Sequence, residues 1–78
     1  MKTYELGDRV SIDWGGGEIQ IGIIIYTSDT GRHCRMMTEW GQTIGADAKD
    51  YTFISKCTKE ELLTHCQERV RKLASIYE

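Results

Sequence analysis

The sequence predicts a mainly β protein with one C-terminal α-helix, built as a small barrel or a strongly bent antiparallel sheet of 4–5 strands. Apolar and polar residues alternate in several short stretches of residues 1–56, which is the period of a half-buried strand. Turn-forming residues separate these stretches at intervals of about 8–14 residues. Over residues 58–77 the apolar period becomes helical, and a chain of 78 residues has room for a single domain, 1–78.

The first two strands are expected to form a hairpin. Residues 9–14 alternate, and residues 18–26 are rich in β-branched side chains, which favour strands. The glycine triplet 15–17 is interpreted as the hairpin tip, because a phosphate-binding loop needs a following helix and usually a lysine. One side of the second strand carries Ile19, Ile21, Ile23 and Ile25. Its far end is apolar on both sides, so we expect the C-terminal helix to cover Ile24 and Tyr26.

Three further segments complete the predicted β region. A turn over 28–31 contains Ser, Asp and Gly, which suit a tight reversal. The segments that follow are a strand over 32–40, a turn at 41–42, a short stretch around 43–46, a polar connection over 47–50 and a last strand over 51–55.

The segment 58–77 is predicted to form one amphipathic helix. Thr58 and Glu61 have the spacing of a capping box, in which each side chain binds the other residue's backbone N–H. A set of apolar side chains falls within about 120° of arc, the width of one buried face. These residues are Leu62, Leu63, Cys66, Val70, Leu73, Ala74 and Tyr77. Beside that stripe, His65, Arg69 and Ile76 form a candidate edge for a partner or a second subunit.

Charge and cysteine content narrow the function classes. The net charge of −2 argues against a chain that coats nucleic acid, because such domains carry a basic excess. The longest apolar run, 23–26, is four residues, too short to cross a bilayer. Residues 1–5 contain no apolar stretch of a secretory signal, so three reduced cysteines and a cytoplasmic location are expected. A chain this short buries little apolar area, which leaves a homo-oligomer open.

Histidines and cysteines give no strong metal or catalytic pattern. They form adjacent pairs at 33–34 and 65–66, whereas structural zinc sites use spaced pairs such as C-x-x-C. Cys34 and Cys66 are interpreted as small buried hydrophobic residues. Cys57 lies near the expected helix start, where a lowered thiol pKa is expected, but no base or carboxylate pair accompanies it. The sequence therefore predicts no metal, no cofactor and no enzymatic activity.

Aromatic and cationic side chains supply the candidate binding residues. Trp14 and Trp40 are expected at strand ends beside glycine turns, where indole rings grip a proline-rich segment, a cation or a base. In the alternative interpretation both tryptophans close the ends of a small core. The predicted partner-binding set is Trp14, Trp40, Tyr26, Tyr51, Arg32 and Arg35. The alternative nucleic-acid surface comprises Arg32, His33, Arg35, Arg69, Arg71 and Lys72.

A family resemblance rests on residues 7–17, which read Gly-Asp-Arg-Val-Ser-Ile-Asp-Trp-Gly-Gly-Gly, followed by Gly22 and an isoleucine run. This pattern, over about residues 7–25, resembles the opening of small bacterial SH3-like barrels of the Tudor-like and KOW-like type. The C-terminal helix is an addition to that pattern. The resemblance implies a module that binds protein segments or nucleic acid through its loops and aromatic positions. We therefore expect a non-enzymatic regulatory or inhibitor protein that acts by protein–protein contact, with nucleic-acid binding as the alternative.

Overall fold

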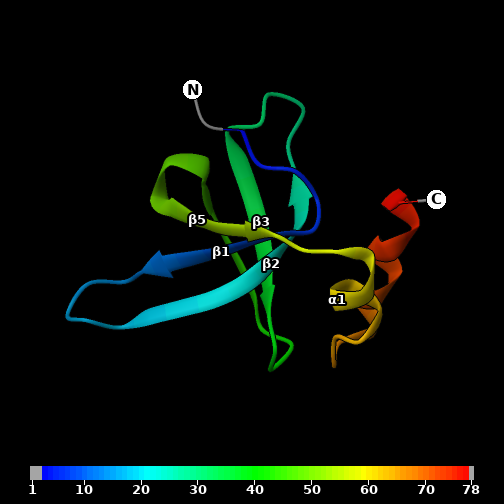
Figure 1. Ribbon diagram of the computed structural model, residues 1–78. Helices are drawn as coiled ribbons and strands as arrows, with labels where there is room; N and C mark the ends of the chain where they lie inside the picture. The colour runs from blue at the N-terminus through cyan, green and yellow to red at the C-terminus, as the bar shows by residue number, and fades with distance from the viewer. Residues whose placement is uncertain (1–2, 78) are drawn as a thin grey trace.

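The computed structural model describes residues 3–77; Met1, Lys2 and Glu78 lie outside the described residues, and the prediction about a secretory signal falls partly on them. The elements are β1 (Asp8–Asp13), β2 (Ile19–Thr27), β3 (His33–Thr38), β4 (Thr43–Asp47), a 3₁₀ turn η1 (Ala48–Asp50), β5 (Tyr51–Lys56), α1 (Lys59–Leu63), α2 (Glu68–Arg71) and a 3₁₀ helix η2 (Lys72–Tyr77). The strands form one open antiparallel sheet of five strands in the order β4-β3-β2-β1-β5 (Figure 1). This arrangement confirms the predicted mainly β class with a helical C-terminal segment. None of the helices within residues 3–77 has the length and apolar character needed to cross a membrane.

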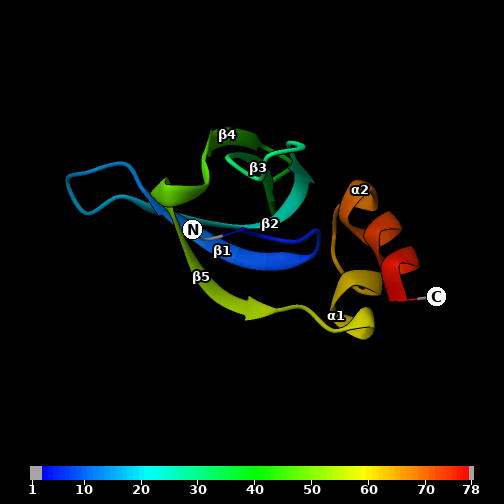
Figure 2. The ribbon, with the colours of Figure 1, turned by 90° about the horizontal axis from the view of Figure 1, so that it is seen from above.

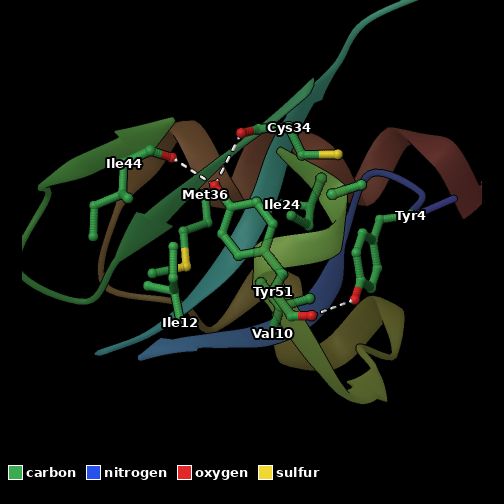
Figure 3. Packing of buried hydrophobic residues seen from close by; sticks show 9 residues of the cluster. Tyr4, Val10, Ile12, Ile24, Cys34, Met36, Ile44 and Tyr51 are labelled. Atoms are coloured by element: carbon green, nitrogen blue, oxygen red, sulfur yellow. Dashed lines mark hydrogen bonds between the residues drawn. The ribbon is translucent and has the colours of Figure 1, made fainter. Parts of the chain in front are cut away.

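The sheet curls, and Tyr51 links its two edges. Tyr51 opens β5, yet its hydroxyl lies 2.9 Å from the carbonyl oxygen of Cys34 in β3 and 3.0 Å from that of Ile44 in β4. The Tyr4 hydroxyl donates to the Tyr51 carbonyl at 3.0 Å, and the two rings meet edge to face (Figure 3). The inner cluster around them consists of Tyr4, Val10, Ile12, Ile24, Cys34, Met36, Ile44, Ala48 and Tyr51.

The opposite, outer face of the sheet is covered at one end by the helices. The outer cluster consists of Ile23, Ile25, Met37, Cys57, Leu62, Val70 and Ala74. Both faces of the far end of β2 are therefore buried, as predicted. The helices cover Ile23 and Ile25, and not Ile24 and Tyr26 as expected. Ile24 belongs to the inner cluster, and Tyr26 is 46% exposed. Alternation is kept from Ile23 to Ile25, so the helices cover the face of β2 opposite to the one expected.

The predicted single helix over 58–77 is wrong, because the segment is broken into α1, α2 and η2 (Figure 2). The capping box at its start is confirmed, with the Glu61 N–H donating to Thr58 Oγ1 at 3.1 Å and the Thr58 N–H to Glu61 Oε1 at 3.0 Å. The break begins at Thr64, whose hydroxyl bonds back to the Glu60 carbonyl at 2.9 Å, an interaction that competes with helix continuation. Beyond it, the Gln67 N–H donates to His65 Nδ1 at 3.0 Å instead of to a helical carbonyl.

The break changes which helical side chains are buried. Leu62, Val70 and Ala74 are buried as predicted. Cys66 is exposed rather than buried, and Leu63 and Tyr77 are 49% and 40% exposed. These residues lose the common face that a continuous helix would have given them.

Beyond the helix-covered region, β2 continues into a long hairpin with β1. Figure 1 shows this hairpin projecting on the side away from the helices. Its tip holds three consecutive glycines with positive φ angles of 90°, 64° and 83°, a conformation that other residues rarely adopt. The β1–β2 pairing reaches Asp13 and Ile19, whereas the β2–β3 pairing ends at Gly22 and Thr38. The last part of β2 therefore extends past the end of β3.

Candidate binding groove

A groove of ≈ 370 Å³ lies where β2 extends past β3, between that extension, the β3–β4 turn and the α1–α2 connection. Its lining includes Ile19, Ile21, Thr38, Glu39, Trp40, Gln42, His65 and Arg9. Ile23 also lines the groove and belongs to the outer cluster, so the groove adjoins the helix-covered face of the sheet. It thus combines residues far apart in the sequence.

The β3–β4 turn holds Trp40 at the rim of the groove. The Gly41 N–H donates to the Thr38 carbonyl at 3.0 Å, and the Gln42 N–H to Thr38 Oγ1 at 3.2 Å. Thr38 is itself 4% exposed and anchors the turn, whereas the Trp40 side chain at its tip is 89% exposed. The backbone of the turn is therefore fixed while its indole is presented to solvent.

The apolar surface of the groove comes mainly from three side chains. Ile19 and Ile21 are 58% and 53% exposed, beside the more exposed Trp40. Residues of this size are normally buried, and their grouping in one concave site is the feature of interest, since single exposed apolar residues are ordinary. The arrangement suits contact with apolar side chains of another molecule.

The charges around the groove are unevenly compensated. Arg9 Nη1 lies 3.1 Å from Glu61 Oε2, so the cation at this end is paired. The backbone N–H of Thr58 bonds to the Glu61 carboxylate and, with Arg9, lowers its pKa. Partial burial lowers the pKa of His65, which favours the neutral imidazole. Among the described residues Glu39 makes no ion pair, which leaves an acidic group at the rim.

The two predicted tryptophans do not share one site. Trp40 lines the groove, whereas Trp14, 53% exposed, lies beside the tip of the β1–β2 hairpin and does not line it. Both indoles are exposed, so neither closes the core. The alternative interpretation of them as core residues is therefore wrong.

The other predicted aromatic residues have different environments. Tyr51 is 2% exposed and holds the inner cluster together, so its side chain is not available to a partner. Tyr26 lies at the opposite end of β2 from the groove, with the Arg35 guanidinium carbon 5.7 Å from its ring centroid. That geometry is a cation–π contact between neighbouring strands.

The predicted cations form two groups. Arg32, His33 and Arg35 lie at the start of β3, where His33 is within 3.9 Å of Asp47. The helical group is partly engaged in its own segment. Arg71 donates to the His65 carbonyl at 2.7 Å and Lys72 lies 3.9 Å from Glu68, whereas Arg69 is exposed.

The three cysteines are unpaired, with Cys34 and Cys57 buried and Cys66 exposed. Within residues 3–77 no three His, Cys, Asp or Glu side chains gather as metal ligands. The expected lowering of the Cys57 pKa is wrong, because this thiol is 1% exposed and burial raises its pKa. Burial likewise raises the pKa of Cys34, in line with its predicted role as a small core residue.

Sequence reasoning missed Ile19 and Ile21 as surface residues. The alternation of β2 placed them on the same face as Ile23 and Ile25, which are buried. The signal that separates the pairs is strand length, since β2 has nine residues and its neighbour β3 has six.

Comparison with protein-family models, curated proteins and solved structures found no significant match.

Proposed function

We propose that this chain is a small, non-enzymatic cytoplasmic binding module of the SH3-like type that acts by protein–protein contact. The observation that carries the proposal is the groove in which Trp40, Ile19 and Ile21 are exposed together. Such side chains anchor protein interfaces because their burial removes a large apolar area from water. A regulatory or inhibitory role follows if the docked partner loses access to another ligand.

The SH3-like assignment is supported by the curled five-stranded sheet. Its first and last strands pair, β1 with β5, and Tyr51 bonds from β5 to the opposite edge. The proposal for the groove does not depend on this assignment, because it rests on the exposed residues themselves.

A matched pair of tryptophan variants tests the proposal. Trp40 lines the groove and Trp14 does not, although both are exposed. We expect a partner captured from the source cell by the wild-type chain to bind about 30-fold more weakly to Trp40→Ala, as for an interface anchor. Trp14→Ala is the control and is expected to retain the partner. Equal binding by wild type and Trp40→Ala in a titration with the purified partner would contradict the proposal.

Nucleic-acid binding is the second candidate function. It is favoured by the cation–π pair of Tyr26 and Arg35, with Arg32 and His33 nearby in sequence, because stacked aromatic and cationic groups suit unpaired bases. Titration of labelled RNA and DNA at two salt concentrations tests it. Affinity that falls steeply with salt, and falls again in Arg35→Gln, supports this candidate.

A further inference from the structure

One edge of β2 has no neighbouring strand at the groove. β1 pairs with β2 from Asp13 opposite Ile19 onward, but β3 pairs with β2 only from Gly22 opposite Thr38. In the described sheet the stretch from Ile19 to Ile21 is therefore paired on one side alone. This free edge borders the groove, which the same residues line.

The direction of the free backbone groups follows from the hydrogen-bond pattern. The Trp14 N–H donates to the Glu18 carbonyl at 2.9 Å, and the Ile24 carbonyl accepts at 2.9 Å from the segment before β1. In an antiparallel ladder alternate residues direct their backbone N–H and C=O groups toward the same neighbouring strand. Residues 18, 20, 22 and 24 therefore direct these groups toward β1. Ile19 and Ile21 therefore direct their N–H and C=O groups to the open side.

β3 does not cover this edge, because its chain turns at Thr38 and the helical connection engages Glu39. If the β2–β3 pairing continued past Thr38, the backbone of Glu39 would form the next hydrogen bonds, with the backbone of Ile21. The Glu39 carbonyl instead accepts from Gln67 Nε2 at 2.8 Å and from Cys66 Sγ at 3.1 Å. The Glu39 carbonyl is therefore engaged by the α1–α2 connection and not by β2, and no strand of the described sheet pairs with Ile21 on this side.

The charges at the edge indicate the chemistry of an added strand. Asp13 and Glu18 flank the end of β2 and are exposed, and Glu39 at the groove rim has no ion-pair partner among the described residues. The nearby cation, Arg9, is already paired with Glu61. A basic segment is therefore favoured. A second copy of this edge is disfavoured, because it would bring like charges together over three residues of strand.

We propose that the free edge of β2 at Ile19–Ile21 accepts an extended peptide of a partner protein as an added strand, with apolar residues alternating with lysine or arginine. Backbone hydrogen bonds to Ile19 and Ile21 give affinity, and alternate apolar side chains pack against these residues and Trp40. The proposal rests on the proposed function, since it names the kind of segment that the groove binds.

The test uses a synthetic peptide of alternating lysine and valine, roughly nine residues long to match a strand. Amide hydrogen exchange of the labelled protein is measured with and without the peptide. We expect exchange at Ile19 and Ile21 to slow by about tenfold or more, while Gln20, which already addresses β1, serves as the internal control. A peptide N-methylated at alternate residues is expected to bind at least about tenfold more weakly, because it lacks the required N–H groups.

A glutamate-for-lysine peptide tests the charge argument. It should bind more weakly than the lysine peptide, and Glu39→Gln should reduce that difference. Failure of the lysine peptide to bind, equal binding of the N-methylated peptide, or unchanged exchange at Ile19 and Ile21 would overturn strand addition. Slow amide exchange at Ile19 and Ile21 in the peptide-free protein would also overturn strand addition if that protection is lost when the protein is diluted. Such a result would mean that a second copy of the chain pairs with the edge in a dimer. In each of these cases the proposed function still holds if the captured partner protein binds wild type but fails to bind Trp40→Ala.

Discussion

Removing the Tyr51 hydroxyl is expected to destabilise the fold by separating the two edges of the sheet. In Tyr51→Phe the carbonyls of Cys34 and Ile44, which lie 2.9 Å and 3.0 Å from this hydroxyl, lose their buried donor. Loss of a buried hydrogen bond that leaves its partner unsatisfied costs about 1–3 kcal/mol. For a domain of this size that corresponds to a Tm lower by about 5–20 °C.

The same variant should change the stability of the protein in alkali. Desolvation raises the pKa of Tyr51 from 10.0 to about 12, so the folded state holds the phenolic proton more tightly than the unfolded state. The resulting stabilisation is complete below pH 10 and is lost as pH rises to about 12, by about 3 kcal/mol in total. Tyr51→Phe lacks this part of the alkaline loss. Tyr4, whose pKa burial also raises, retains its own contribution.

Chemical denaturation at neutral pH and at several values between pH 9 and 12 measures both effects. Tyr26→Phe is the matched control, because Tyr26 is 46% exposed and its loss of a hydroxyl should change the unfolding free energy by less than about 0.5 kcal/mol. Equal stability of Tyr51→Phe and wild type at neutral pH would refute the role assigned to the hydroxyl. An unchanged alkaline decline in Tyr51→Phe would refute the pKa argument.

The remaining predictions concern the helix start and the centre of β2. Thr58→Ala removes the capping bond to the Glu61 N–H, 3.1 Å long, and should cost about 1 kcal/mol in denaturant unfolding, whereas Thr58→Ser should retain most of the stability. A loss of equal size in both Thr58 variants would show that the hydroxyl does not act as the cap. Gly22→Ala places a methyl group 2.7 Å from the Met37 carbonyl oxygen and should lower the free energy of unfolding by about 1–3 kcal/mol. Gly17→Ala is the comparison variant, because no atom lies within 4 Å of the added methyl group but φ is +83°, so it reports backbone strain without crowding. A Gly22→Ala protein as stable as wild type would contradict the crowding argument.

The strands were predictable because their signals are local. Alternation and glycine-containing turns located β1 and β2 to within a residue or two, and the capping box at Thr58 marked the start of α1. The helical segment was not predictable in the same way. Its apolar period fits one continuous helix, but Thr64 bonds back to the helix and Gln67 bonds to the Glu39 carbonyl, a residue 28 positions earlier.

The candidate site was only partly predictable. Trp40 could be proposed as a binding residue from its place beside a glycine turn, and its side chain is 89% exposed. Tyr51 has the same aromatic character, but its hydroxyl finds buried carbonyls on β3 and β4, which no local pattern indicates. Residue type alone therefore does not separate a binding aromatic side chain from one that holds the core together.

The sequence by itself determined where the strands fall along the chain, the turns between them and the presence of an amphipathic C-terminal segment, because these follow from the chemistry of neighbouring residues. Only the tertiary structure decided which residues of β2 are covered. Ile23 and Ile25 lie under the helices, whereas Ile19 and Ile21, with the same side chain and the same alternation, are left exposed where β3 ends. Burial depends on which other element lies over a residue, and that is set by contacts between segments far apart in the chain.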